Sequence, residues 1–199
     1  MHAGLTLVEL MVTLAVFALL VVIAVPAFNN VININRTAEG INAISRDLSM
    51  ARSEALARNA NVTICASTNA VTAATPTCSG ANAWETGWIV FVDFNRDGVI
   101  NGNDVLLRAT GPIASGYTLL ASGFDDTTQI QFRPTGEPRD INGNGINQGT
   151  FRLRDNNADT NQNKRIRAIN VSPVGRVSLA VDSNGNGIVE DYNGNDITS

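Results

Sequence analysis

The chain has 199 residues, with 14 Lys or Arg against 18 Asp or Glu, and so carries a net charge of −4 at pH 7. Its only histidine is His2 and its only cysteines are Cys65 and Cys78, which excludes a Cys–His zinc site. No histidine stands beyond residue 2 to activate a serine or cysteine nucleophile, so we expect no enzyme.

The first element predicted is an apolar helix. Over residues 10–28, 19 consecutive residues carry no charge, and only Thr13 is plainly polar. As a helix this run would be ~28 Å long, close to the ~30 Å hydrocarbon core of a bilayer. The alternative is a helix buried in a soluble core, but a helix on a soluble domain would carry a polar stripe. The run therefore predicts a transmembrane helix over about residues 10–28.

The residues before this run differ from a secretory signal peptide, in which the small-residue cleavage site follows the apolar stretch. Here the small residues Ala3 and Gly4 precede it, and Glu9 stands at its start. The segment Gly-Leu-Thr-Leu-Val-Glu-Leu, which begins at Gly4, resembles the prepilin signature of type IV pilins and type II secretion pseudopilins. The resemblance implies that residues 1–4 are a leader, that prepilin peptidase cuts between Gly4 and Leu5, and that Leu5 is then N-methylated.

The same resemblance implies that Glu9 and Pro26 act in assembly. A carboxylate at the edge of an apolar helix costs ~2.5–3.5 kcal/mol on membrane insertion, and so usually marks a function. In pilins the corresponding glutamate is thought to pair with the free amine of a neighbouring subunit. The alternative is an acidic residue favoured by the dipole at a helix start. Pro26 stands where many pilins bend this helix.

After Pro26 the helical pattern resumes as an amphipathic segment over residues 30–60. Apolar residues recur at steps of three and four on one face: Ile41, Ile44, Leu48, Ala51 and Ala55. Charged residues fill the other sides: Arg46, Asp47, Arg52, Glu54 and Arg58. The run Asn59-Ala60-Asn61 is a suitable stop, so we predict one helix over residues 5–60.

From Val62 the sequence changes to short β-like segments separated by Gly, Asn and Asp. These are residues 62–66, 88–93, 105–110, 117–121, 129–133, 150–154, 165–172 and 176–181. Strands at short spacing with turns between them form an antiparallel sheet rather than β–α–β units. A long helix bent at a proline and packed on such a sheet predicts an α+β fold. The β-rich domain covers residues 61–181, and an acidic tail covers residues 182–199.

Four segments of the body point to a family. They are Ala51-Arg52-Ser53-Glu54-Ala55, Gly87-Trp88-Ile89-Val90-Phe91-Val92-Asp93, Leu107-Arg108, and Val171-Ser172-Pro173-Val174-Gly175-Arg176-Val177. In this order they resemble the FimT/GspH-type minor pilins and pseudopilins. The resemblance implies a single-pass protein of the bacterial inner membrane, with its globular domain in the periplasm. The protein would then join other pilins or pseudopilins in a filament, as a structural subunit in assembly of a type IV pilus or a type II secretion pseudopilus.

The two cysteines fit this location. A domain outside the cytoplasm lies in an oxidising space, where disulfides form and persist. We therefore predict that Cys65 and Cys78 are bridged and close a short loop.

One segment has the ligand spacing of an EF-hand-type calcium loop. Over residues 93–104, oxygen-bearing side chains stand at loop positions 1, 3, 5, 9 and 12, and glycine stands at position 6. The candidate ligands, including a main-chain carbonyl at position 7, are Asp93, Asn95, Asp97, Val99, Asn101 and Asp104. The same opening recurs at residues 140–145 and 182–187. Hairpin turns also use Asn, Asp and Gly, so turn chemistry is the alternative. The predicted function requires no cofactor, and calcium is the one candidate ligand.

A binding role is the rival function. Some FimT-like members have been linked to DNA uptake through an arginine-bearing segment, which here contains Arg176. Residues 133–176 hold eight basic residues against four acidic ones. Nucleic-acid affinity comes mostly from neutralising phosphates, and residues 182–199 oppose it because they carry four acids and no base. We therefore favour the structural role over a filament-displayed module that binds DNA or another surface.

Overall fold

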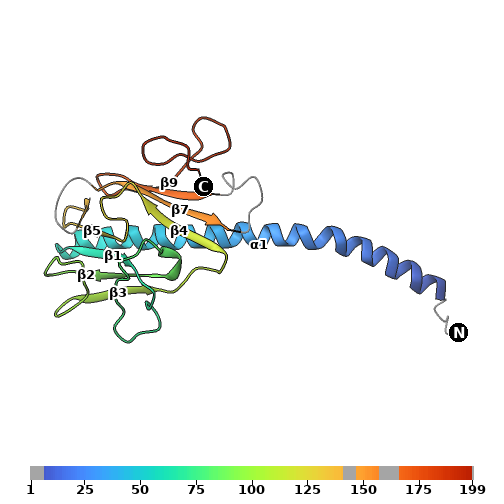
Figure 1. Ribbon diagram of the computed structural model, residues 1–199, viewed down its shortest axis with the longest axis horizontal. Coiled ribbons are helices and arrows are strands. Elements are labelled where there is room, and N and C mark those ends of the chain that lie inside the picture. The colour runs from blue at the N-terminus through green and yellow to red at the C-terminus, as the bar shows by residue number, and fades with distance from the viewer. Residues whose placement is uncertain (1–6, 141–146, 157–165, 199) are drawn as a thin grey trace. The chain divides into compact units, whose positions relative to one another are not determined.

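The computed structural model describes residues 7–140, 147–156 and 166–198, without the side chains of residues 23, 25–31 and 33. The chain divides into two compact units, Met1–Arg36 and Thr37–Ser199. The helix α1, Leu7–Arg58, begins in the first unit and ends in the second (Figure 1). The predicted cleavage site, Gly4 and Leu5, lies outside the described residues.

In the first unit, α1 exposes apolar side chains all round. Every residue from 7 to 22 is exposed, with Leu7 at 75% and Phe17 at 65%. The hydroxyl of Thr13 donates to the Leu10 carbonyl at 2.9 Å, so the polar group inside this stretch is satisfied by the helix itself. Within the part of the chain that the structure describes, no helix is both long and apolar enough to cross a bilayer.

The predicted assembly residues both lie within α1. Glu9 is exposed in its first turn, and α1 continues without a break through Pro26. The predicted span, residues 10–28, includes positions whose side chains are outside the description. The span and the bend at Pro26 therefore stay predictions.

The second half of α1 has the predicted apolar face. The five residues from Ile41 to Ala55 that the periodicity selects are all buried. The helix ends at Arg58 because Asn59 takes a left-handed conformation with φ 51°. The Ala60 N–H then donates to the Ala55 carbonyl at 3.3 Å, which satisfies one of the last carbonyls of the helix.

Asp47 departs from the prediction for this helix. The sequence places it on the solvent side, but its side chain is fully buried. Its Oδ2 accepts the Trp88 indole N–H at 2.9 Å and the Thr110 hydroxyl at 2.7 Å. Its Oδ1 lies 2.9 Å from Nε of Arg108. These partners offset the cost of removing the carboxylate from water and bind α1 to two strands.

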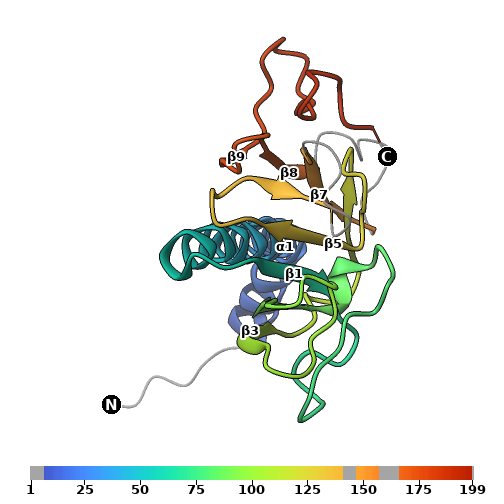
Figure 2. The same cartoon turned by 90° about the vertical axis from the view of Figure 1, so that its left-hand side faces the viewer.

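The strands form two antiparallel sheets (Figures 1 and 2). Sheet A has the order β3-β2-β1-β5-β6, with β1 Val62–Ala66, β2 Trp88–Val92, β3 Val105–Thr110, β5 Gln129–Phe132 and β6 Pro138–Arg139. Sheet B has the order β4-β7-β8-β9, with β4 Tyr117–Ser122, β7 Gly149–Asp155, β8 Arg167–Val171 and β9 Val177–Leu179. A short 3₁₀ helix, η1, covers Trp84–Thr86.

The α+β class and the eight predicted strand positions are confirmed. The strands divide between two sheets where the prediction has one, and the two-residue strand β6 was not predicted.

The main core lies between α1 and the inner faces of both sheets. Its residues include Leu48 of α1, Val90 of β2 and Phe151 of β7. Trp84 of η1 packs edge-on against Phe151, with ring centroids 4.9 Å apart. Gly40 permits the close approach of helix and sheet B, because a Cβ at this position would lie 2.9 Å from Cδ2 of Leu153.

Each sheet also has a small cluster on its outer face. On sheet A, Cys65, Ile89 and Phe91 pack with Ile100, which lies in the loop after β2. On sheet B, Ile166 and Ala168 pack with Ile197 of the C-terminal segment. In the described tail, Glu190 and Asp196 form an isolated antiparallel bridge. The tail therefore folds on itself, and Ile197 packs it against sheet B.

Candidate functional site

The predicted calcium loop, residues 93–104, connects β2 to β3 and starts from a buried anchor. Asp93 is fully buried, and its Oδ2 accepts hydrogen bonds from side chains of two neighbouring strands. These donors are the Thr63 hydroxyl at 3.0 Å and the Gln131 amide at 2.8 Å. Within the loop, the N–H groups of Arg96 and Gly98 donate to Asp93 at 2.7 and 3.0 Å. The carboxylate is thus held by both the sheet and the loop.

The other two acids of the loop hold its remaining turns. Asp97 Oδ1 accepts the Val99 N–H at 2.8 Å, and its Oδ2 accepts the amides of Asn95 and Asn101 at 2.7 and 2.8 Å. These donors, the Val99 N–H first, hold the pKa of Asp97 below its usual value because they stabilise the ionised form. Asp104 accepts the N–H groups of Phe94 and Asn101 at 2.9 and 3.0 Å.

These three carboxylates converge. Asp93, Asp97 and Asp104 each offer an oxygen, and these oxygens lie within 4.8 Å of one another. Calcium holds its oxygen ligands at about 2.3–2.6 Å, so two ligands on opposite sides of the ion are at most about 5.2 Å apart. The three acids therefore fit a calcium ion.

The side-chain amides of the loop are not oriented for metal binding. Asn95 and Asn101 turn their nitrogens toward Asp97, and calcium would require each amide to present its oxygen. The carbonyl of Val99 completes the predicted ligand set. The spacing of the three carboxylates is thus compatible with the ion, while the two amides would have to rotate.

Of the two repeats of the motif, the structure describes one in full. Five of the six residues at 140–145, positions 141–145, lie outside the described residues. At residues 182–187, Asp182 is exposed and accepts the N–H groups of Gly185, Asn186 and Gly187 at 2.7 to 3.1 Å. The side-chain amides of Asn184 and Asn186 donate to Asp196 at 3.1 and 2.7 Å. This loop closes on itself and on Asp196, with no contact from a strand among these bonds.

Cys65 and Cys78 are joined by a disulfide in the structure, with Cα atoms 5.6 Å apart. Cys65 lies on β1, and both cysteines belong to the outer cluster of sheet A together with Ile100 of the calcium loop. The bridge therefore fastens the segment after β1 beside that loop.

Arg176, the candidate DNA contact, is an exposed residue in the turn between β8 and β9. The preceding Gly175 has φ 76°, and a Cβ there would lie 1.9 Å from the Gly136 carbonyl oxygen. This position excludes any larger residue. The packing of the Gly175 turn against the Gly136 turn therefore explains why this motif has a glycine, and no DNA contact is needed to explain it.

The segments that carry the family resemblance meet in the fold. Nε of Arg52 donates to the Gly136 carbonyl at 3.2 Å and would lie 3.0 Å from a Cβ on Gly175. Asp47 joins Trp88 of the second segment to Arg108 of the third. The shared segments hold the end of α1 on the sheets, so their residues are those of a structural framework.

The model of the type II transport protein GspH matches residues 40–175, which is most of the chain. The chain belongs to the GspH family. A second model, the prokaryotic N-terminal methylation motif, matches residues 1–25 of this GspH-family protein. No curated protein sequence matches it significantly.

Solved structures place the GspH-family chain in the pilin fold. The type IV minor pilin FimU of Pseudomonas aeruginosa superposes with a TM-score of 0.55 at 18% identity, over 74% of this chain and 90% of FimU. A second crystal form of FimU gives a TM-score of 0.51 at 17% identity, over 72% of this chain and 92% of FimU. The minor pseudopilin EpsH of Vibrio cholerae gives 0.46 at 9% identity, over 72% of this chain and 95% of EpsH. The expected GspH-type family and prepilin-type N-terminus are confirmed by the two family models.

Proposed function

We propose that this protein is a minor subunit that helps to assemble a type IV pilus or a type II secretion pseudopilus. One combination supports this above all. A methylation motif over residues 1–25 includes the part of α1 that exposes apolar residues on every side, and the GspH region over residues 40–175 follows in the same chain. Its role is structural and not catalytic.

The exposed part of α1 requires an apolar environment. A contiguous apolar surface of this kind on a soluble protein marks a membrane or protein contact. Before assembly, the inner membrane covers it, with the globular unit in the periplasm. After assembly, the helices of other pilins or pseudopilins cover it in the filament core. Prepilin peptidase releases residues 1–4, which leaves Leu5 as the methylated first residue.

Glu9 provides the test of this proposal. In the filament its carboxylate pairs with the free amine of a neighbouring subunit, so both charges are neutralised as the subunit leaves the bilayer. Glu9→Ala should leave membrane insertion and cleavage intact, because removing a charge favours the bilayer. The mutant protein should be at least tenfold depleted from sheared filaments. Half-buried Glu54 of the second unit, which pairs with Arg58 within α1, gives a comparison variant, Glu54→Ala, that should be incorporated normally.

Cleavage can be measured on the same samples. Intact-mass analysis of filament-associated protein should give a chain that begins at methyl-leucine 5 in the wild type and in both variants. Normal incorporation of Glu9→Ala, or a chain that begins beyond residue 20, would refute the proposal. Deletion of the gene, with piliation and secretion measured side by side, assigns the subunit to one machine.

We also propose calcium as an accessory ligand of residues 93–104. Three carboxylates within 4.8 Å of one another repel, and a bound cation would offset this repulsion. We do not propose DNA binding, since Arg176 is followed by a tail with four acids and no base.

A further inference from the structure

A small pocket lies on the outer face of sheet B, away from the calcium loop and the family motifs. Strand alternation places Leu119 and Leu153 in the core, so their neighbours Leu120 and Arg152 face outward. In the pairing of β4 with β7, Thr118 lies opposite Arg154 and Leu120 opposite Arg152. Ile166 and Thr198 complete the lining of a cavity of about 80 Å³.

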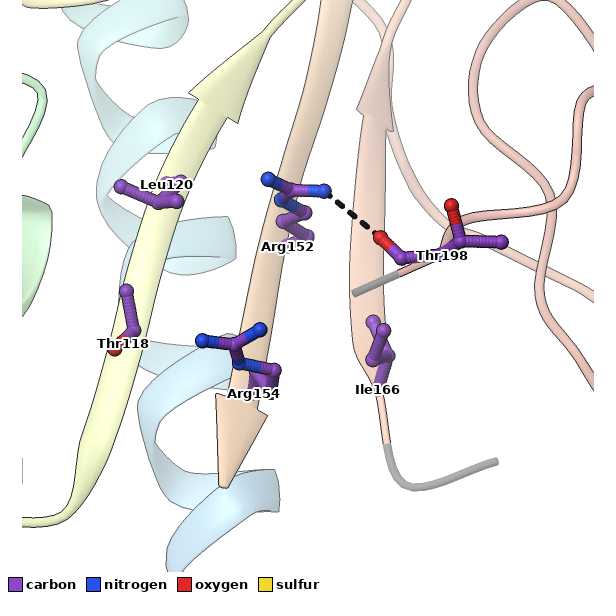
Figure 3. A pocket seen from close by; sticks show the side chains of 6 residues that line it. All are labelled: Thr118, Leu120, Arg152, Arg154, Ile166 and Thr198. Carbon is purple, nitrogen blue, oxygen red and sulfur yellow. Dashed lines mark hydrogen bonds between the residues drawn. The ribbon is translucent and has the colours of Figure 1, made fainter. Parts of the chain in front are cut away.

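The two arginines of the pocket lie between the apolar side chains of Leu120 and Ile166. Figure 3 shows the guanidinium groups of Arg152 and Arg154 along β7, with Thr118 and Leu120 on one side and Ile166 and Thr198 on the other. Two residues along a strand are about 7 Å apart, so the two guanidinium groups can approach the same small ligand.

The two arginines lack acidic partners in the described part of the chain. Arg152 donates to the main-chain carbonyl of Thr198 at 3.0 Å, and neither arginine forms an ion pair with any described carboxylate. Asp155 is next in sequence to Arg154, but alternation turns it to the other face, where it is buried. Asp196, the tail acid closest in sequence to Thr198, accepts the amides of Asn184 and Asn186. Two like charges on one face are thus left without a described counter-charge.

We propose that Arg152 and Arg154 bind one oxyanion, a phosphate or carboxylate group, in this pocket. The planar guanidinium donates paired hydrogen bonds that match the oxygens of both groups. The hydroxyl of Thr118 lies on the same rim, where it donates to the side-chain oxygen of Asn156 at 2.9 Å, so the two guanidinium groups are the donors left to the ligand. The cavity is far smaller than the roughly 300–1,000 Å³ of pockets for drug-sized ligands, so it takes a single anionic group rather than a whole cofactor.

The test is calorimetric titration of the full-length protein in non-ionic detergent, at pH 7 and low ionic strength. Inorganic phosphate and acetate are titrated separately into the wild type and into Arg152→Gln, Arg154→Gln and Arg176→Gln. The third variant removes an exposed arginine outside the pocket and is the control for net charge. We expect one saturable site, with affinity at least tenfold lower in each pocket variant and changed less than twofold in Arg176→Gln.

The comparison of the two anions identifies the source of the group. Tighter binding of phosphate points to a phosphate ligand, and tighter binding of acetate points to a carboxylate such as that of an acidic side chain. Thermal unfolding checks that all variants remain folded, and the two pocket variants serve as independent tests. The proposal is overturned if neither anion binds saturably, or if Arg176→Gln weakens binding as much as the pocket variants do.

Discussion

A segment rich in Asp and Asn packs against the outer face of each sheet, and the two segments are held in different ways. Residues 93–104 contribute Ile100 to the outer cluster of sheet A, while residues 182–198 contribute Ile197 to that of sheet B. The first segment starts at buried Asp93, which is bonded to side chains of β1 and β5. The second starts at exposed Asp182, which caps only its own turn.

The difference shows that one motif can serve two purposes. In both segments the first Asp caps the backbone N–H groups of the following turn, as short polar side chains commonly do. Only in residues 93–104 are strand donors added and three carboxylates gathered at one point. The motif alone therefore indicates a turn, and the surroundings decide whether it is also a candidate metal site.

Replacement of the first Asp in each loop should give the largest contrast. Asp93→Ala leaves Thr63, Gln131 and two main-chain N–H groups without their acceptor, and we expect a loss of about 4 kcal/mol in the free energy of unfolding. Asp182→Ala exposes its donors to water, so its loss should stay below about 1 kcal/mol. Urea unfolding of the full chain measures both. Equal losses would mean that the link of Asp93 to the strands adds nothing.

The disulfide sharpens the comparison further, because a crosslink fastens the segment beside residues 93–104 and no cysteine lies in the tail. Removing the bridge in the double variant Cys65→Ser, Cys78→Ser should cost roughly 3 kcal/mol, from the entropy of a loop of about 14 residues. Denaturant unfolding gives the value. Before reduction, neither cysteine of the wild type should react with a thiol label, and labelling of both would show that no bridge forms.

Calcium should bind residues 93–104 and not the tail, which gives a further difference between the two segments. With calcium at 100 times its dissociation constant, linkage raises the free energy of unfolding by about 2.7 kcal/mol. Extracellular loops bind calcium at about 10⁻⁴–10⁻³ M, so tens of millimolar calcium approach this limit. Differential scanning calorimetry should show a higher Tm for the wild type and for the tail variant Asp196→Ala. Asp97→Ala should show no rise in Tm on addition of calcium. If the wild type shows no such rise either, residues 93–104 are a turn and not a calcium site.

The smallest expected effect concerns the hold of the tail on sheet B. Ile197 is 6% exposed and packs in a cluster in which three of the described residues are buried. Ile197→Ala should therefore cost about 1.5 kcal/mol, below the roughly 2–5 kcal/mol of a large core. Limited proteolysis should cut within residues 182–198 at least several-fold faster than in the wild type, while the segment 93–104 keeps its resistance. Unchanged cleavage would mean that the side chain of Ile197 does not hold the tail on sheet B.

Local patterns allowed much of this fold to be predicted from the sequence. The buried face of α1 follows from spacing at three and four residues, and its end follows from Asn59. The strands follow from apolar segments between turn residues. Such features depend on neighbours within about ten residues.

Features that depend on distant partners could not be predicted in this way. Asp47 was placed toward solvent because a charge in a helix usually is, but its partner Trp88 stands 41 residues further along the chain. The division into two sheets depends on pairings such as β1 with β5 and β4 with β7. Alternation within β7 does place Arg152 and Arg154 on one face, but nothing in the sequence brings Thr198 beside them.

The buried carboxylate of Asp47 has a consequence for a chain pulled by its N-terminal end. Tension enters the globular unit along α1 and must pass to the strands through side chains. Asp47 bonds at once to Trp88 on β2 and to Thr110 and Arg108 on β3. Sliding of α1 along its axis would load these three contacts together instead of one after another. Asp47 thus links α1 to β2 and β3 against sliding along the helix axis.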